Sequence, residues 1–291
     1  MTAAEAPFTP EQEIARIEAK CDVLTTPSGD GEMVWRAFGD GPPLVLLHGA
    51  YGSWMHWIRN VEALSKHFRV LAADMPGFGD SASPTDTTSV VSLVETIARG
   101  LDRLTVGDGP VLVGGFSYGG TMSAPVALAC KRKIDTICMV GTHGLGGKRG
   151  EPGPLINWHE VEGPEAMREA QRHNLSKIMF ADAAKIDDLA IHIQTTNTVR
   201  TVFRPRLIVD RDKIAGSVAK VDARLTAIWG TLDATAYPYV DECVDRFMKV
   251  RPDAVMHLLD GIGHWACYEA AQQFNPIMIE TLGMEPADAS A

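Results

Sequence analysis

The stretch at 111–120, with the sequence V-L-V-G-G-F-S-Y-G-G, is the feature that most constrains the fold of this chain. An apolar run rich in valine and leucine ends in G-F-S-Y-G at 115–119, and mostly small residues follow at 121–129. This pattern predicts a buried strand that turns sharply into a helix, with Ser117 at the strained corner. Glycines are expected on both sides because a side chain there would collide with the neighbouring strand or helix. The sequence therefore predicts a serine whose hydroxyl stands above the edge of a sheet.

Strand-like and helix-like patterns alternate along the rest of the chain. The apolar run at 43–48 is continuous, as in a strand buried on both faces of a sheet, whereas 33–38 alternates like an edge strand. Strands that alternate with helices predict a mostly parallel sheet flanked by helices. The expected strands are 33–38, 43–48, 69–74, 111–116, 135–140, 225–229 and 254–259, and the expected helices are 11–20, 57–68, 89–104, 121–129, 239–250 and 266–282.

One long segment interrupts this alternation. Between 142 and 221 the chain has Gly/Pro-rich pieces and short helix-like stretches, without the pattern of a strand. We therefore expect a mainly helical lid at 142–221, inserted between the two parts of one core at 1–141 and 222–291. A chain of 291 residues is long enough for one large α/β domain with such an insertion.

Charge and cysteine content limit the partner and the compartment. The chain has 27 basic and 37 acidic residues and no run rich in Lys or Arg, which argues against a nucleic acid as partner. Its five cysteines form no C-x-x-C pair, which fits reduced thiols. The first ten residues lack the pattern of a signal peptide. No apolar run reaches the roughly 18 residues that span a membrane. We expect a cytoplasmic protein without a membrane partner.

Three loops that follow expected strands carry side chains suited to acyl transfer. Ser117 is the candidate nucleophile, Asp233 follows the strand at 225–229, and His264 follows the strand at 254–259. Parallel strands place their carboxyl ends at one edge of the sheet, where ligand sites lie. We expect His264 to take the proton of Ser117 and return it to the leaving group, while Asp233 holds the imidazole tautomer.

Each of these residues has a plain structural interpretation when it is taken alone. A Gly-Ser-Gly turn between strand and helix is often only tight packing, and a single Asp or His after a strand is often a helix cap. The three together, in this order and each after its own strand, favour a catalytic set whose test is its geometry.

The same chemistry needs hydrogen-bond donors for the oxyanion of a tetrahedral intermediate. We expect one donor to be the backbone N–H of Tyr118, directly after the nucleophile. The other is expected in the loop H-G-A-Y-G at 48–52, as the N–H of Ala50. The aromatic residues Tyr51, Trp54 and Trp57 on this loop suggest an apolar or aromatic acyl site, although such residues often pack in the core.

Further residues are expected around the substrate pocket. An aromatic beside the catalytic histidine, as at Trp265, can form a wall of the pocket or simply pack in the core, and the sequence leaves both open. The other histidines, His56 among them, are expected to be surface or packing residues. No metal-ligand spacing and no G-x-G-x-x-G after the first strand is present, so we expect no metal and no cofactor. The expected pocket residues are His48, Gly49, Tyr51, Phe116, His143 and Trp265.

Matches to one known family extend over nearly the whole chain. In five short motifs spread along its length, the chain resembles the α/β-hydrolase-fold serine hydrolases, whose triad has the order Ser, Asp, His. The resemblance implies a mostly parallel central sheet flanked by helices, with a helical lid. A serine at 117, where haloalkane dehalogenases and epoxide hydrolases of this fold have Asp, argues against both of those chemistries. The matching motifs are His48-Gly49, D-M-P-G-F-G-D-S at 74–81, G-F-S-Y-G at 115–119, W-G-T-L-D at 229–233 and Gly263-His264.

Three stretches resemble a narrower group, the meta-cleavage-product hydrolases, which hydrolyse a C–C bond in ring-fission products of aromatic degradation. That resemblance implies a lid arginine that binds the substrate carboxylate. Arg200, Arg204 and Arg206 are candidates by region, with a solvated surface role as the alternative for each. It also implies that a homodimer can form, for which no segment identifies an interface. The stretches are W-I-R-N at 57–60, P-G-F-G-D-S at 76–81, and G-H-W-A at 263–266 followed by Glu269 and Phe274-Asn275.

The chain departs from that group at two places. Phe116 stands where the group usually has Asn, and the loop at 48–53 reads H-G-A-Y-G-S instead of H-G-x-G-P-G. The substrate is therefore open: a small carbonyl compound whose cleaved bond is an ester or a C–C bond. The arginines at 200–206 favour an anionic substrate, whereas Phe116 favours the neutral ester of a plain carboxylesterase. A catalytically silent ligand receptor of the same fold is the alternative from another class, and the complete triad argues against it.

Overall fold

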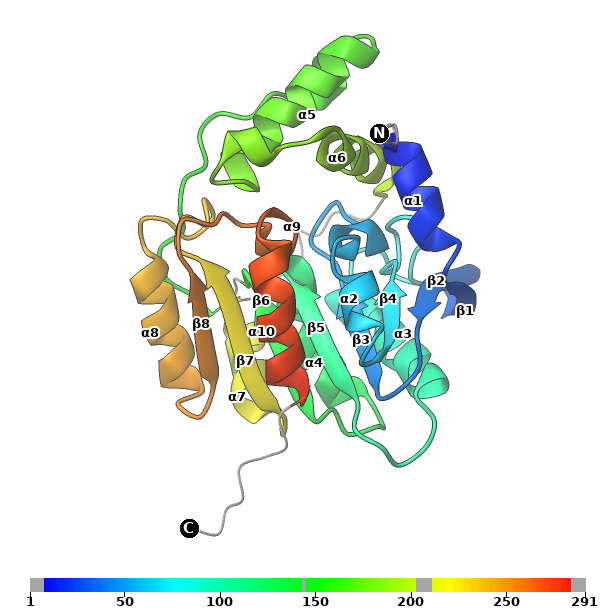
Figure 1. The fold of residues 1–291 in the computed structure, drawn as a ribbon. Helices are drawn as coiled ribbons and strands as arrows, with labels where there is room; N and C mark the ends of the chain where they lie inside the picture. The colour runs from blue at the N-terminus through cyan, green and yellow to red at the C-terminus, as the bar shows by residue number, and fades with distance from the viewer. Residues whose placement is uncertain (1–7, 143–144, 203–210, 284–291) are drawn as a thin grey trace, which may run out of the picture.

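The computed structural model describes residues 8–142, 145–202 and 211–283. Within these ranges one eight-stranded sheet runs through the molecule in the order β1-β2-β4-β3-β5-β6-β7-β8 (Figure 1). The first two pairs, β1 with β2 and β2 with β4, are antiparallel, and every later pair is parallel. The strands are β1 (Asp22–Ser28), β2 (Gly31–Phe38), β3 (Pro43–Leu47), β4 (Arg69–Ala73), β5 (Leu112–Phe116), β6 (Thr136–Val140), β7 (Arg224–Gly230) and β8 (Val255–Leu259).

Helices cover both faces of this sheet, and each face has its own hydrophobic core. One face packs against α2 (Val61–Leu64), α9 (Ala266–Glu269) and α10 (Ala271–Gly283). The other packs against α3 (Val90–Leu104), α4 (Tyr118–Ala129), α7 (Arg211–Lys220) and α8 (Val240–Val250). The central strands β3 and β5 are buried on both faces because helices cover them on both sides. The predicted mostly parallel sheet flanked by helices is therefore confirmed.

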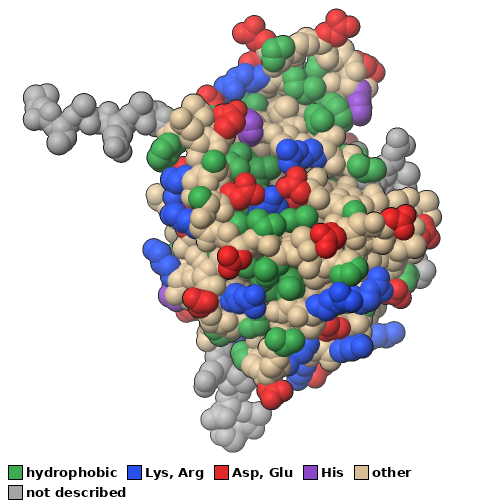
Figure 2. All heavy atoms as spheres, turned by 90° about the vertical axis from the view of Figure 1, so that its right-hand side faces the viewer, with side chains coloured by type: hydrophobic (Ala, Val, Ile, Leu, Met, Phe, Trp, Pro, Cys, Tyr) green, Lys and Arg blue, Asp and Glu red, His purple; other side chains and the backbone are tan. Residues whose placement is uncertain are grey.

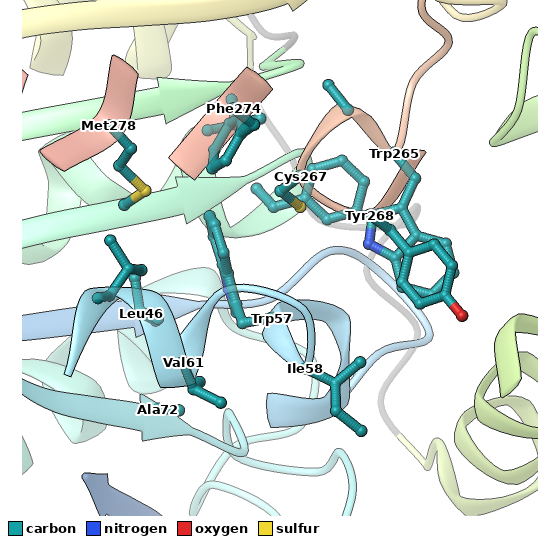
Figure 3. Close-up of a cluster of buried hydrophobic side chains, with 14 of the residues drawn as sticks. Leu46, Trp57, Ile58, Val61, Ala72, Trp265, Cys267, Tyr268, Phe274 and Met278 are labelled. Atoms are coloured by element: carbon teal, nitrogen blue, oxygen red, sulfur yellow. The ribbon is translucent and has the colours of Figure 1, made fainter. Parts of the chain in front are cut away.

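The core on the α10 face is built around large aromatic side chains. Trp57, from the short helix η1 (Trp54–Trp57), lies against Phe274 of α10 with ring centroids 6.2 Å apart. Figure 3 shows these rings between Leu46 of β3 and the α9 residues Cys267 and Tyr268. This packing joins residues 46–61 to the last two helices, α9 and α10.

The chain between β6 and β7, here called the β6–β7 segment, contains most of the remaining helices. Its helices α5 (Pro164–Ile178) and α6 (Asp188–Arg200) lie above the carboxyl edge of the sheet (Figure 1). The short turn η3 (Ala183–Lys185) lies between them, η2 (Trp158–Glu160) precedes α5, and α1 (Pro10–Glu18) packs beside α6. The last helix of the segment, α7, instead packs on α4 of the core.

Three local predictions were wrong. The stretch at 33–38 is not at the edge, because the unpredicted strand β1 pairs with β2 along its whole length and takes the edge position. Instead of one helix at 57–68, the chain forms η1, which ends at Trp57, and the four-residue α2. Asn60 lies between these two elements, and its side chain bonds to the carbonyl oxygen of Cys267. The expected closing helix at 266–282 is interrupted at Ala270 into α9 and α10.

The surface gives a mixed picture of charge. On the face at the β1 edge of the sheet, acidic and basic side chains are interspersed, as Figure 2 shows. Among the helices of the described residues, none combines the length and the apolar character needed to cross a membrane. The cytoplasmic location stays a prediction.

Candidate active site

Ser117 occupies the turn between β5 and α4 in a left-handed backbone conformation, with φ +51°. Such a conformation is costly for a residue with a side chain and persists only where the surroundings enforce it. The enforcement comes from close packing on both sides. A Cβ atom at Gly119 would lie 2.6 Å from the carbonyl oxygen of His48, and one at Gly115 would lie 2.6 Å from that of Gly119. The flanking glycines therefore let α4 approach the sheet closely enough to force Ser117 into its turn.

Two further loops place His264 and Asp233 in line with this serine. Nε2 of His264 lies 2.9 Å from Oγ of Ser117, and Nδ1 lies 2.7 Å from Oδ2 of Asp233. Asp233 is fully buried and accepts two further hydrogen bonds on Oδ1, from the N–H and the hydroxyl of Thr235 at 2.8 and 2.7 Å. A carboxylate only accepts, so the imidazole carries its proton on Nδ1 and presents Nε2 as a base to the serine.

Thr235 was not predicted from the sequence. Its hydroxyl donates a hydrogen bond to Oδ1 of Asp233 and also lies 3.4 Å from Nδ1 of His264. It therefore helps to fix the orientation of the carboxylate. The only sequence signal was its position two residues after a candidate acid, where Thr commonly bonds a neighbouring Asp.

The loop after β3 approaches the same serine from the opposite side. Tyr51 in this loop has φ +52°, and it and Ser117 are the non-glycine residues with positive φ in the described part of the chain. The N–H of Tyr118 is the first of helix α4, and such N–H groups have no partner inside their helix. Ala50 and Tyr118 both line the cavity into which Ser117 opens. The positive end of the α4 dipole therefore lies at this cavity.

The cavity above Ser117 has a volume of about 600 Å³. Leu175 and Ile178 of α5, together with Phe116, give the cavity an apolar part of its lining. Lys148 and Arg149 also line it, and no acidic side chain is among the lining residues that the structure describes; Nζ of Lys148 lies 3.7 Å from Glu242, which is not one of them. The lining residues are Gly49, Ala50, Tyr51, Phe116, Ser117, Tyr118, Thr121, Gly146, Gly147, Lys148, Arg149, Gly150, Pro152, Asn174, Leu175, Ile178, Met179, Gln194, Thr235 and His264.

Several expected pocket residues lie elsewhere. His48 is fully buried beneath the loop that it begins, where it bonds the main chain of Gly49 and Met75. Trp265 is also fully buried, and its indole N–H donates to the carbonyl oxygen of His56 at 2.9 Å. Its ring lies in the hydrophobic core and is not among the described residues that line the cavity. His143, Arg204 and Arg206 lie outside the described residues.

Arg200 pairs with a carboxylate away from the cavity above Ser117. Its Nη1 lies 2.7 Å from Asp80, which also pairs with Arg36 at 2.5 Å. Arg36 in turn pairs with the buried Asp74 at 2.9 Å. Burial raises the pKa of this carboxyl group, and the charge of Arg36 opposes part of that rise. The D-M-P-G-F-G-D-S motif therefore supports the fold, through an ion-pair network that reaches the end of α6.

Glu269, in the C-terminal motif, joins the His264 loop to the β6–β7 segment. Its buried carboxylate accepts from the N–H of Gly263 at 2.8 Å and from the N–H groups at 181 and 182 at 3.2 and 2.9 Å. The N–H of Trp265 donates to the carbonyl oxygen of Met179 at 2.8 Å. The loop that presents His264 is thus bonded to the end of α5.

The other C-terminal motif residues contact the W-I-R-N stretch. Nδ2 of Asn60 donates to the carbonyl oxygen of Cys267 and to Oδ1 of Asn275, at 2.8 and 2.7 Å. Asn275 returns a hydrogen bond to the carbonyl oxygen of Arg59 at 3.1 Å. These hydrogen bonds therefore join the W-I-R-N stretch to the C-terminal motif, although the two are far apart in the sequence. In the described residues no group of three or more His, Cys, Asp or Glu is placed to hold a metal ion.

Comparison with known families decides the class of this protein. The sequence model of the Alpha/beta hydrolase family matches residues 44–277. The chain belongs to the alpha/beta hydrolase family. This range includes every strand from β3 onward together with the three loops of the site. The expected fold class and the expectation of a hydrolase of this fold are confirmed.

Three curated relatives of this hydrolase are 25% to 28% identical to it. One is a 2-hydroxy-6-oxononadienedioate/2-hydroxy-6-oxononatrienedioate hydrolase from Cupriavidus pinatubonensis, 28% identical over 82% of this chain and 86% of the relative. Another is a 2-hydroxy-6-oxo-6-(2'-aminophenyl)hexa-2,4-dienoic acid hydrolase from Metapseudomonas resinovorans, 25% identical over 85% and 86%. A third is the dihydrolipoyllysine-residue acetyltransferase component of an acetoin cleaving system from Pseudomonas putida, 28% identical over 83% of this chain. The chain spans 64% of the length of that component.

Solved structures share the fold at lower identity. The meta-cleavage product hydrolase CumD from Pseudomonas fluorescens IP01 aligns with a TM-score of 0.71 at 22% identity, over 90% of this chain and 98% of that one. Carboxylesterase CesB from Bacillus subtilis aligns with a TM-score of 0.71 at 16% identity, over 94% and 95%. These likenesses show the fold.

Proposed function

We propose that this hydrolase cleaves an activated carbonyl compound with Ser117 as nucleophile, His264 as general base and acid, and Asp233 as the residue that orients the imidazole. The observation that carries the proposal is the chain of short contacts from Ser117, which lines the cavity, through His264 to the buried Asp233. The N–H groups of Ala50 and Tyr118 are the proposed oxyanion donors. Each such donor contributes about 3 kcal/mol of transition-state stabilisation.

The reaction begins when Oγ of Ser117 attacks the substrate carbonyl carbon and Nε2 of His264 takes the hydroxyl proton. The carbonyl oxygen becomes an oxyanion between the N–H groups of Ala50 and Tyr118. Collapse of this intermediate expels the leaving group, which receives the proton from His264. A water molecule then attacks the acyl-enzyme by the same route and restores Ser117.

The first candidate substrate is a ring-fission dienoate, in which a C–C bond breaks. The leaving carbon keeps the electron pair, which the conjugated dienoate delocalises until His264 protonates it. Two observations support this candidate. Relatives that match over most of both chains bear the names of such hydrolases. Lys148 and Arg149 also line the cavity, and their positive charge favours an anionic substrate, although Nζ of Lys148 already lies 3.7 Å from Oε1 of Glu242.

The second candidate substrate is a small neutral ester. Phe116 lines the cavity with an apolar ring, 5.1 Å from the ring of His264 between centroids. Arg200, expected near the substrate carboxylate, is instead paired with Asp80. An ester needs neither a carboxylate partner nor an electron sink, so these observations favour a carboxylesterase.

We propose that the part of the β6–β7 segment above the sheet edge acts as a lid. Its helix α5 supplies Asn174, Leu175 and Ile178 to the cavity wall, so it bounds the substrate. Helix α7, although it falls within the lid range expected from the sequence, packs on the core and is assigned to it.

The test is a comparison of kcat/KM for a ring-fission dienoate and a short-chain p-nitrophenyl ester, in the wild type and in Ser117→Ala. Ser117→Ala should lose activity on the order of a millionfold, as in the best-studied triad enzyme, while Ser65→Ala retains it. Activity of Ser117→Ala within tenfold of the wild type would refute the nucleophile. Failure of a fluorophosphonate to label Ser117 in the folded wild type would instead indicate a silent receptor.

The substrate class is decided by the two cations. For the dienoate, Arg149→Ala and Lys148→Ala should raise KM, and for the neutral ester they should leave KM unchanged. A preference for the ester by orders of magnitude, with no effect of either substitution, would establish the carboxylesterase.

A further inference from the structure

His56 is a buried histidine that the proposed reaction does not use. It lies in η1, is fully buried, and its Nδ1 accepts a hydrogen bond from the N–H of Gly49 at 3.1 Å. Because Nδ1 accepts, the neutral ring carries its proton on Nε2. No hydrogen-bond partner for Nε2 is present among the described residues. Burial lowers the pKa of His56, and His48 and His264 act in the same direction, which keeps the ring neutral.

The ring of His56 packs against the neighbours of both Ser117 and His264. Its centroid lies 5.5 Å from the ring of Phe116, the residue before the nucleophile, and 5.0 Å from Trp265, the residue after the catalytic histidine. The loop after β3 also folds over it. A Cβ atom at Gly52 would lie 2.5 Å from Nδ1, so this loop fits over the ring only with glycine there.

A second buried histidine holds the other side of Gly49. Nε2 of His48 accepts from the N–H of Met75 at 3.0 Å, so its proton is on Nδ1, which donates to the carbonyl oxygen of Gly49 at 2.7 Å. That carbonyl belongs to the same planar trans peptide as the N–H of Ala50, and the two groups point in opposite directions. Fixing the carbonyl of Gly49 therefore fixes the direction of the N–H of Ala50.

The two histidines thus act on consecutive peptide planes. His48 holds the plane that contains the N–H of Ala50, and His56 holds the preceding plane through the N–H of Gly49. A single hydrogen bond would leave the loop free to rotate about the bonds at Gly49, which lacks a side chain. Two bonds on either side of that residue remove this freedom.

We propose that His56 is a positioning residue, which fixes the oxyanion donor of Ala50 by accepting the N–H of Gly49. The inference rests on the proposed function, because it needs an oxyanion to form at Ala50. A role in packing alone does not account for a histidine here. A leucine would fill similar space without burying an Nε2–H group that has no partner. The contact that an imidazole makes and an apolar side chain cannot make is the bond to Gly49.

The experiment compares His56→Leu, which removes the acceptor, with His56→Asn, whose side-chain oxygen can take the place of Nδ1. The substrate is a p-nitrophenyl ester, and the exposed His67→Leu is the matched control. Losing an oxyanion donor costs about 10²–10³ in kcat, and a misaligned donor should cost less. We expect kcat to fall roughly 10- to 100-fold in His56→Leu, with KM within about threefold, and most of it to return in His56→Asn.

A second readout separates positioning from a general loss of packing. A trifluoromethyl ketone forms a tetrahedral adduct that needs the oxyanion donors, whereas the leaving-group product p-nitrophenol has no acyl oxygen to place there. Inhibition by the ketone should weaken by the same factor as kcat, and inhibition by the product should stay unchanged. The wild type supplies an independent check that needs no variant. The ¹⁵N signals of His56 should show an unprotonated Nδ1 and a protonated Nε2.

Three results would overturn the inference: wild-type kcat in His56→Leu, no recovery in His56→Asn, or a proton on Nδ1 in the wild type. Failure of the proposed function gives a different pattern. The wild type would then show no hydrolysis that depends on Ser117 and no labelling by a fluorophosphonate.

Discussion

Replacing Glu269 with alanine should destabilise the protein and lower its activity together. The carboxylate accepts three backbone N–H groups, one in the His264 loop and two at the end of α5, and the residue is only 6% exposed. Truncation leaves these donors without a partner in the protein. Each buried donor left unsatisfied costs about 1–3 kcal/mol. Because water can enter the space left by the side chain, we expect a total loss of about 3–5 kcal/mol.

Glu269→Gln gives a graded version of the same test. One side-chain oxygen remains, which can still accept from Gly263 and Ala181, but the amide NH₂ then faces the N–H of Asp182. The variant loses one acceptor and the charge that strengthens the other bonds, so we expect a loss of about 2 kcal/mol. For a chain of this size that corresponds to a fall in Tm of roughly 4 °C.

Urea unfolding followed by tryptophan fluorescence measures both losses, with the exposed Glu280→Ala of α10 as the control. The control should stay within about 0.5 kcal/mol of the wild type. In the Gln variant kcat should also fall, because Gly263 directly precedes His264. The reasoning fails if Glu269→Ala unfolds within about 1 kcal/mol of the wild type, since the N–H groups would then be satisfied without the carboxylate.

Three further predictions concern residues that support the site. Burial lowers the pKa of His48 to about 4, so between pH 4 and the unfolded value near 6.5 only the unfolded chain gains this proton. The stability that the neutral ring contributes is complete above pH 6.5 and is lost as the pH falls toward 4. His48→Asn should therefore reduce the slope of unfolding free energy against pH by about 1.4 kcal/mol per unit in urea titrations, and an unchanged slope would contradict burial of the neutral ring. Arg36→Met leaves the charge of Asp74 buried without its partner, and should cost about 3–5 kcal/mol in the same assay; a loss below 1 kcal/mol would count against the network. Gly119→Ala forces a methyl group onto the main chain of β3 and should abolish fluorophosphonate labelling, whereas Gly216→Ala, in open space on α7, should stabilise by about 1 kcal/mol in thermal unfolding.

The sequence predicted the parallel sheet because β3 and β5 are continuous apolar runs, which only a strand covered on both faces requires. It did not predict β1, whose inward-facing residues include the polar Thr26 and Ser28. Thr26 is satisfied there by a hydrogen bond from the indole of Trp35, at 2.9 Å. A strand whose buried side chains are polar has no apolar alternation to detect.

The sequence predicted the candidate-site residues that directly follow a strand. It did not predict those that only tertiary contacts bring to the cavity. Ser117, Asp233 and His264 each follow an apolar strand, so the local pattern located them. Lys148 and Arg149 lie on a Gly/Pro-rich loop without periodicity, and only the folding of that loop over the Thr235 turn, with Gly150 bonded to it, brings them to the cavity. Tertiary contacts of this kind leave no trace in local sequence.

The same limit applies to His56, which was expected to be a surface or packing residue. Its bond to Gly49 joins residues seven apart across an irregular loop, and neither periodicity nor a motif predicts such a contact. Trp265 was open between two roles for a related reason, because the partner of its indole N–H is a carbonyl oxygen 209 residues away.

The residues that α5 contributes to the cavity, Asn174, Leu175 and Ile178, share one side of that helix because they are one, three and four positions apart, and Met179 follows directly after its last turn. The proposed catalytic groups, Ser117, His264 and Asp233, lie on loops of the core instead. The residues proposed to bound the substrate and those proposed to react with it therefore lie on separate segments of the chain. Side-chain replacements at 175 and 178 change the shape that a substrate must have, yet they touch no hydrogen bond of Ser117, His264 or Asp233. Point substitutions on α5 can therefore change which acyl groups fit the cavity while the proposed reaction stays the same.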